Sequence, residues 1–235
     1  MEEQLLKIFE GNSELFITTS STGEVDERGK VQVETFTVHE PVTLKLWKDH
    51  LDGKQRIGIK PEKDDLCKWG CIDIDPQSYK DYSQKKVIDI LRDNQLPLIP
   101  VRSKSGGLHL FLFLNDWSPV KDVLKKLHEW NKNFFQALEV FPMNKCMNMP
   151  YFNMNATTEF AYNENNTPIM IGGFLDLVKN KTVTIEQLSN IKVKEYEPEE
   201  DWKHYPPCIQ KMIMDKWSGN HRNDLLYNVG VLEMK

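Results

Sequence analysis

The stretch Lys68-Trp-Gly-Cys-Ile-Asp-Ile-Asp75, which ends at Pro76, decides the fold of this chain. It is an apolar run broken by two aspartates and stopped by a proline, so it predicts a buried strand over residues 68–75. Residues two apart on a strand point to the same face, which places Asp73 and Asp75 side by side. Two carboxylates held together on a buried strand repel each other, and a divalent cation is the usual remedy. The alternative assigns one aspartate to a turn and the other to a helix cap.

Working outward from this strand, hydrophobic periodicity and turn residues predict alternating helices and strands. Before it we expect a helix over 2–10, strands over 14–19 and 31–38, a helix over 42–51 and a strand over 56–60. After it we expect a helix over 84–94 capped by Ser83, strands over 97–103 and 107–114, a helix over 119–137, an extended piece over 138–141, and helices over 172–179 and 185–190. Residues 143–168 are rich in asparagine and show no period, and two more helices fit 206–217 and 223–235. The pattern is that of an α+β protein, with the apolar strand over 107–114 at the centre of a covered sheet.

Composition allows one large domain, or one domain with a small appendage, in 235 residues that are 40% hydrophobic. The start, MEEQLLKIFEGN, is acidic and amphipathic, unlike a signal peptide, and no stretch approaches a membrane span. We therefore expect a cytoplasmic protein with no membrane partner. The net charge of −5 neither recommends nor excludes a nucleic-acid partner, because acid is concentrated in residues 195–201.

The cysteines Cys67, Cys71, Cys146 and Cys208 are too few and scattered for a disulfide scaffold. A zinc site would need two further ligands beside Cys67 and Cys71, and no paired Cys or His motif supplies them. Buried thiols are the better interpretation.

A second candidate feature is the turn between the predicted strands 97–103 and 107–114. It holds Arg102, Lys104, Ser105, Gly106 and Gly107. The two glycines let backbone N–H groups approach an anion, and the cations and the hydroxyl add donors, so the turn suits a triphosphate. Downstream, His109 lies on an apolar strand, where a lone histidine is more often a core residue.

A third feature is Glu139 in Leu-Glu-Val-Phe-Pro, an acid between apolar residues at a predicted helix-to-strand junction. Alone it is unremarkable. Beside Asp73 and Asp75 it would complete a two-metal site for phosphoryl transfer.

Together these segments resemble the archaeo-eukaryotic primase superfamily, in which an acid-x-acid strand, a small-x-His strand and an apolar-acid motif follow in order. Here they are WGCIDID at 69–75, SGGLHLFLF at 105–113 and LEVFP at 138–142. The chain most resembles primase-polymerase domains of phages and mobile-element conflict systems, which also share turns like His50-Leu-Asp-Gly53 and segments like NMPYFN at 148–153. It departs from many relatives at Gly107, where they have Ser, and at Glu139, where they have Asp.

The resemblance implies an α+β fold: a core sheet like the RNA-recognition motif (RRM), an N-terminal α/β lobe and a short helical tail. It implies a catalytic domain over 1–194, then an acidic linker and the start of a truncated helical primase domain over 195–235. The implied metal ligands are Asp73, Asp75 and Glu139, holding two Mg²⁺ or Mn²⁺ ions. The implied nucleotide contacts are Arg102, Lys104, Ser105, Gly106, Gly107 and His109.

The implied activity is template-directed nucleotidyl transfer that starts or extends primers in phage or mobile-element replication, in the cytoplasm of a bacterial host. The implied partners are a single-stranded DNA template, a primer strand, NTP or dNTP, and a helicase in the same longer polypeptide.

Three alternatives stay open. A non-catalytic single-strand-binding module would use stacking aromatics, for which Trp47, Tyr79, Phe111, Phe113, Tyr151 and Phe152 are available. A replication-initiator endonuclease would need a second histidine where Phe111 stands. A glycosyltransferase with an acid-x-acid motif would leave the Ser-Gly-Gly-x-His turn unexplained.

Overall fold

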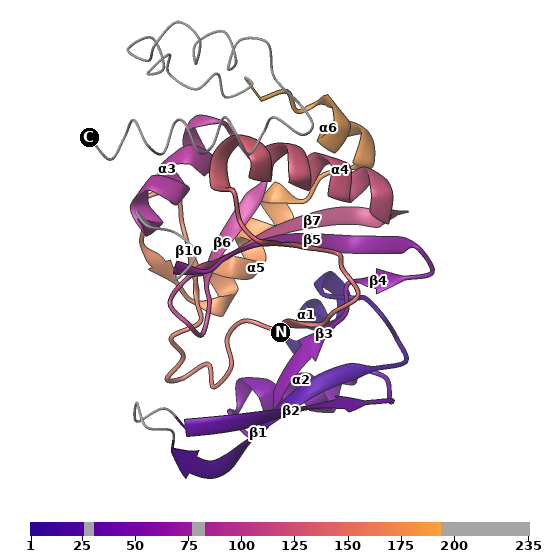
Figure 1. Ribbon diagram of the computed structural model, residues 1–235, viewed down its shortest axis with the longest axis vertical. Helices are drawn as coiled ribbons and strands as arrows, with labels where there is room; N and C mark the ends of the chain where they lie inside the picture. Colours follow the sequence, from indigo (N-terminus) through magenta and orange to yellow (C-terminus); the bar gives the residue numbers. More distant parts are fainter. Residues whose placement is uncertain (26–30, 77–82, 194–235) are drawn as a thin grey trace, which may run out of the picture. The chain divides into compact units, whose positions relative to one another are not determined.

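The computed structural model describes residues 1–25, 31–76 and 83–193, and of residues 20–25 and 31–33 it describes the backbone only. Residues Met1–Val193 form one compact unit of mixed α and β structure with antiparallel sheets (Figure 1). The coarse fold class expected from the sequence is confirmed. The helices expected over 206–217 and 223–235, and the tail segment 195–235 as a whole, lie outside the described residues.

The N-terminal part builds a four-stranded antiparallel sheet in the order β2-β1-β3-β9. Its elements are α1 (Glu2–Ile8), β1 (Phe16–Val25), β2 (Val31–Val38), α2 (Leu44–Leu51), β3 (Arg56–Ile59) and the later β9 (Met147–Asn148). The α2 helix begins at Leu44 because Thr43 caps it, its side chain accepting a hydrogen bond from the Leu46 N–H. We refer to this part as the N-terminal lobe.

The second sheet has seven strands and carries the acid-x-acid segment. Its strands are β4 (Glu62–Lys63), β5 (Leu66–Ile74), β6 (Leu98–Arg102), β7 (Leu108–Pro119), β8 (Glu139–Phe141), β10 (Ala161–Tyr162) and β11 (Pro168–Ile169). The order is β11-β10-β6-β7-β5-β4, and β8 pairs with β5 beside this path. The helices that accompany it are α3 (Gln84–Asp93), α4 (Val120–Trp130), α5 (Ile171–Lys181) and α6 (Ile185–Asn190).

Within the large sheet, one continuous unit runs β5-α3-β6-β7-α4-β8 along the chain. In space its strands lie in the order β6-β7-β5-β8, and every pairing is antiparallel. The central position of β7, between β6 and β5, confirms the expectation drawn from its uninterrupted apolar pattern.

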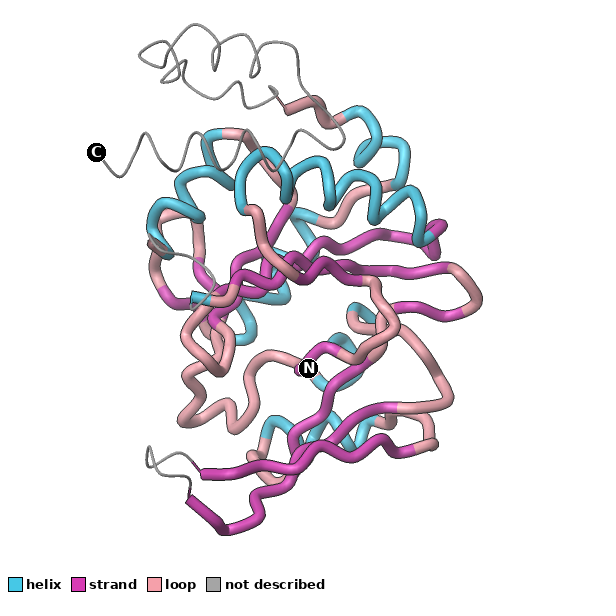
Figure 2. Tube along the Cα trace, in the orientation of Figure 1, coloured by secondary structure: helices cyan, strands magenta, loops and turns pink. Residues whose placement is uncertain are grey.

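The two faces of the large sheet pack into two separate cores, as strand alternation requires. One face carries Trp69, Cys71, Phe111 and Phe113 toward the N-terminal lobe, α1 and α5. The other carries Ile72, Ile74, Leu110 and Leu112 toward α3, α4 and α6. Figure 2 shows α3 and α4 along one side of the strands, with the N-terminal lobe along the other. From Trp69 onward, a side chain on β5 therefore faces the N-terminal lobe if its number is odd. Cys67 precedes an irregularity in the pairing register and belongs to the other core.

The helix expected over 119–137 is wrong in its C-terminal third. The α-helix ends at Trp130, and a π-helical turn, η2 (Asn131–Phe135), follows it. The Asn131 side chain accepts from the Ala137 N–H at 2.8 Å and donates to the Ala137 carbonyl at 2.9 Å. This pair of hydrogen bonds, with Gln136 in the left-handed region, turns the chain sharply into β8.

Within the part of the chain that is described, no helix is long and apolar enough to cross a bilayer.

Candidate functional site

The candidate site is built on a row of side chains that crosses three neighbouring strands of the large sheet. Asp73 on β5 pairs with His109 on β7 at one side and with Glu139 on β8 at the other. Directly paired residues on antiparallel strands project to the same face. The register therefore brings together Glu139, Asp73 and His109, which are far apart in the sequence, on the face toward the N-terminal lobe.

Asp73 lies at the centre of this row, between Glu139 and His109. Its side chain is 28% exposed. Burial, followed by repulsion from Glu139 and from Asp75, raises the pKa of the Asp73 carboxyl to about 6. Crowded carboxylates that are partly removed from water are stabilised by binding either a proton or a cation. Near neutral pH, binding a cation is the more effective way to neutralise their charge.

His109 is the neighbour of Asp73 on the opposite side from Glu139. Its Nε2 lies 3.5 Å from Asp73 Oδ1, and its side chain is 14% exposed. Burial lowers the pKa of His109 to about 4, so the imidazole is neutral near pH 7. A neutral imidazole offers one N–H donor and one acceptor nitrogen, which suits hydrogen bonding to a phosphate oxygen without adding charge.

The other two carboxylates are less enclosed than Asp73. Asp75 follows the last residue of β5 and is exposed, while Glu139 Oε1 accepts from Lys145 Nζ at 2.7 Å. Within the described ranges, no three His, Cys, Asp or Glu side chains are grouped as a metal site. The donor chemistry suits a hard divalent cation, since it consists of carboxylate oxygens beside one another. The structure thus assembles Asp73 with Glu139, and leaves Asp75 at the open end of the strand.

The turn between β6 and β7 is organised by Ser103, a residue that sequence reasoning missed. Ser103 is buried, and its Oγ accepts from the Gly107 N–H at 3.0 Å. The same Oγ lies 3.0 Å from the Ser105 hydroxyl, and Gly106 has φ +91°, a conformation that favours glycine. The only sequence signal for this role is a serine at a strand end four residues before a glycine.

Gly107 cannot carry a side chain in this backbone. A Cβ at this position would lie 2.1 Å from the carbonyl oxygen of Ile74 and 2.8 Å from Pro76 Cδ. The start of β7 therefore approaches the end of the acid-x-acid strand more closely than any other residue permits. This close approach is the steric reason for a glycine at position 107, and the hydroxyls of the turn are those of Ser103 and Ser105.

The two cationic residues of the turn, Arg102 and Lys104, do not lie in the carboxylate row with His109. Arg102 pairs with Leu108, one residue away from the Val101–His109 pair, so it begins on the other face of the sheet. Its Nη1 donates to the Thr158 carbonyl at 3.1 Å, and Nη2 lies beside Gly106. Lys104 is exposed in the turn itself. Of the predicted nucleotide contacts, the structure places His109 in the carboxylate row and the others around the adjoining turn.

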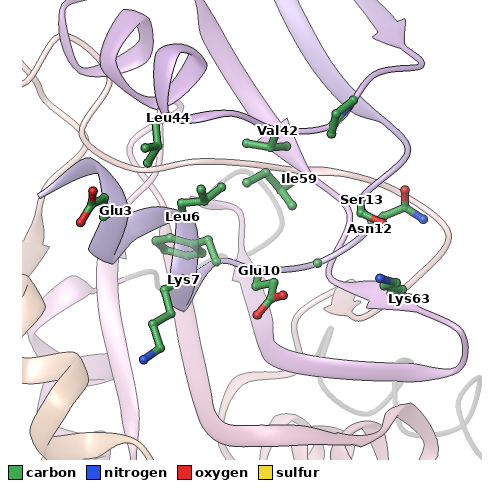
Figure 3. A pocket seen from close by; sticks show the side chains of 13 residues that line it. Glu3, Leu6, Lys7, Glu10, Asn12, Ser13, Val42, Leu44, Ile59 and Lys63 are labelled. Atoms are coloured by element: carbon green, nitrogen blue, oxygen red, sulfur yellow. The ribbon is translucent and has the colours of Figure 1, made fainter.

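Large cavities lie away from the carboxylate row. One of about 470 Å³ lies between α1, the segment before α2 and the end of β3, and Figure 3 shows Leu6, Val42, Leu44 and Ile59 around it. Its lining mixes two acids, Glu3 and Glu10, with two lysines, Lys7 and Lys63. None of the residues predicted to bind metal or nucleotide lines this cavity.

The residues on which the alternatives depended are mostly in the core. Trp47, Phe111, Phe113 and Tyr151 are buried, Phe152 lies under the Arg56 guanidinium at 4.3 Å, and Tyr79 lies outside the described residues. The four buried rings are not available to stack with bases.

The described cysteines are free thiols. Cys67 and Cys71 are buried in the two different cores, on opposite faces of the sheet, and Cys146 is partly buried. Cys67 and Cys71 therefore do not point into a common site. Cys208 lies outside the described residues.

A mixed α/β unit with antiparallel sheets, a carboxylate-histidine row and an adjoining glycine turn is compatible with the archaeo-eukaryotic primase class. A family model described as the archaeo-eukaryotic primase domain of the TOTE conflict system matches residues 15–141, more than half of the chain. The chain belongs to this family. The matched range includes all the predicted site residues, from Asp73 to Glu139. A comparison with curated proteins finds no match.

Proposed function

We propose that this chain is a primase-polymerase, which joins nucleotides on a single-stranded DNA template to start or extend a primer. The observation that carries the proposal is the row Glu139–Asp73–His109, in which two crowded carboxylates and a neutral histidine share one face of three strands. Membership of the archaeo-eukaryotic primase family gives the reaction class, nucleotidyl transfer.

The sheet topology supports the finer fold proposal. A β-α-β-β-α-β unit whose strands lie in the order second, third, first, fourth is the arrangement of the RNA-recognition motif, and β5-α3-β6-β7-α4-β8 has this order. We propose that this unit is the RRM-like core, joined to the N-terminal lobe. Residues 1–194 then form the catalytic domain, with a helical domain and a helicase further along the polypeptide.

In the proposed mechanism Asp73, Asp75 and Glu139 would hold two Mg²⁺ or Mn²⁺ ions. When bound, such ions lower the pKa of an attacking hydroxyl and stabilise negative charge on the phosphate during transfer. The side chain of Glu139 must leave Lys145 or share its oxygen for this set to form.

The chain's own groups orient the nucleotide. Neutral His109 donates one N–H to a phosphate oxygen, and the turn at Ser105 to Gly107 supplies a hydroxyl and backbone N–H groups. The primer 3′-oxygen attacks the α-phosphorus, a new P–O bond forms, the bond to the bridging oxygen breaks and pyrophosphate leaves. The proton of the hydroxyl passes to solvent. Arg102 and Lys104 add positive charge beside the turn.

The single-strand-binding module is the remaining rival in a different class. It fits less well because carboxylates on the nucleic-acid face repel phosphates and because most of the candidate stacking rings are buried. It predicts binding without synthesis, so one assay separates the two.

The test is nucleotide incorporation on single-stranded DNA, with and without a primer, in Mg²⁺ and in Mn²⁺. We expect metal-dependent synthesis that falls by at least about a thousandfold in Asp73→Ala/Asp75→Ala, because about 4 kcal/mol of transition-state stabilisation is removed. The control Asp93→Ala/Asp116→Ala removes two exposed aspartates elsewhere and keeps wild-type synthesis. Undiminished synthesis by a folded Asp73→Ala/Asp75→Ala variant would contradict the assignment.

A further inference from the structure

Lys145 lies at the site although it is outside the matched family range and outside every motif quoted above. It follows β8 in the segment that leads to β9, and its Nζ lies 2.7 Å from Glu139 Oε1. Beside it in the chain, Asn144 accepts from Lys60 Nζ at 2.9 Å, which ties this segment to the residue after β3. The ammonium is therefore held next to the third carboxylate of the row.

The charge balance of the row explains why a cation belongs there. Glu139 and Asp73 are cross-strand partners on one face of the sheet, so their two negative charges repel each other. An ammonium at Glu139 relieves part of that repulsion. A divalent cation bound to the same pair would relieve it as well, and more strongly, because it carries twice the charge.

We propose that Lys145 is an internal competitor of the metal ion: its ammonium occupies Glu139 until a divalent cation displaces it. This inference rests on the proposed metal site. An oxygen that accepts from an ammonium at 2.7 Å has one lone-pair direction in use, and a metal must approach that oxygen to about 2.0–2.2 Å. The Lys145 side chain is 58% exposed and that of Glu139 38% exposed, so the ammonium can swing into solvent when it is displaced.

Competition by Lys145 changes the apparent affinity of the site for a metal ion. Breaking an exposed ion pair costs little free energy, less than breaking a buried pair. Lys145 therefore weakens metal binding by a small but measurable amount. Lys145 then raises the metal concentration at which the site fills, and it keeps the carboxylate row charge-compensated before filling.

The test measures Mn²⁺ affinity directly, by calorimetry or by the electron paramagnetic resonance signal of free Mn²⁺, at near-neutral pH and about 0.15 M salt. Lys145→Gln removes the charge of the side chain and keeps a polar group on a side chain one atom shorter. We expect it to bind Mn²⁺ roughly two- to fivefold more tightly than the wild type, the range set by exposed ion pairs. The matched control is Lys125→Gln, an exposed lysine on α4, which keeps wild-type affinity.

A double-mutant cycle separates competition at Glu139 from a general change of field. In a Glu139→Gln background, Lys145→Gln has no partner to release and leaves the remaining affinity unchanged. Equal or weaker Mn²⁺ binding by Lys145→Gln, or the same gain in both backgrounds, would overturn the competitor role. If Asp73→Asn and Glu139→Gln bind Mn²⁺ as the wild type does, the proposed metal site itself fails, a result distinct from the failure of the competitor.

Discussion

Two histidines, His50 in the N-terminal lobe and His109 in the large sheet, share a lowered pKa and differ in the partners of their ring nitrogens. Burial lowers the pKa of each to about 4, so both are neutral near pH 7. His50 is fully buried, while the His109 side chain keeps 14% of its exposure. A depressed pKa by itself therefore does not tell a structural histidine from a functional one.

The difference lies in the partners of the ring nitrogens. His50 Nδ1 accepts from the Ile57 N–H at 3.2 Å, so Nε2 carries the proton and donates to the Pro150 carbonyl at 2.9 Å. Both nitrogens are thus used to join α2, β3 and the segment after β9. His109 instead places Nε2 3.5 Å from a carboxylate of the candidate site, beyond good hydrogen-bond length. The comparison separates His50, whose two ring nitrogens are both hydrogen-bonded within the core, from His109, whose Nε2 faces the carboxylates of the candidate site.

Replacing His109 tests the functional half of this comparison and has the largest expected effect. His109→Ala should lower nucleotide incorporation about a hundredfold or more, because it removes one positioned donor to the phosphates. The free energy of unfolding should fall by less than in His50→Ala, because the His109 side chain keeps 14% of its exposure whereas His50 is fully buried. Steady-state incorporation on a primed template, with thermal unfolding of the same samples, measures both quantities. A stable variant with wild-type synthesis would place His109 among core residues.

Replacing His50 tests the structural half. His50→Ala leaves the Ile57 N–H and the Pro150 carbonyl buried without their partner, and it opens a cavity beside Trp47 and Phe152. We expect a loss of about 3 kcal/mol in the free energy of unfolding, measured by chemical denaturation. In mild conditions, where the variant stays folded, its incorporation rate should stay within about threefold of the wild type.

The stability carried by His50 also depends on pH. Its folded pKa of about 4 lies below the ordinary value of 6.5, so between these pH values the unfolded chain binds more protons. The contribution is fully present above pH 6.5 and is lost as pH falls toward 4, by about 3 kcal/mol in total. The charged group that faces the ring is Arg56, which lowers the pKa further and is itself held by Glu159 at 2.7 Å. Unfolding curves at several pH values should show a steeper acid loss in the wild type than in His50→Ala; parallel losses would contradict this origin.

The sequence predicted the elements that local chemistry specifies. Ser83 caps α3 as expected, and Thr184 forms a capping box with Gln187 at the start of the helix expected over 185–190, because these hydrogen bonds span only three residues. The apolar runs of β5 and β7 were equally clear. The end of α4 was mispredicted because the Asn131 side chain closes the turn, and the two-residue strands β9, β10 and β11 are too short to show a period.

The residues of the candidate site could be chosen from the sequence, but their arrangement in space could not. Three motifs in the right order suggested Asp73, Asp75 and Glu139, yet no local pattern fixes which residue of β8 pairs with which residue of β5. That register sets Glu139 beside Asp73 and is determined by packing of the whole sheet. Ser103 and Lys145 were missed for the same reason, since their contacts depend on how a turn folds back.

The smallest expected effect is that of replacing Ser105, which lies in the turn just before His109 and is compared with Ser103. Its hydroxyl is exposed and bonded to Ser103, whereas Ser103 is buried and also holds the Gly107 N–H. Ser105→Ala should therefore raise the KM for nucleotide roughly two- to fivefold with no loss of stability, the value of one hydrogen bond to the phosphates. Ser103→Ala is the matched variant, and it should lower the free energy of unfolding by about 1 kcal/mol because the turn loses its internal acceptor. If Ser105→Ala leaves KM unchanged while Ser103→Ala raises it, then Ser103 contacts the nucleotide and Ser105 does not.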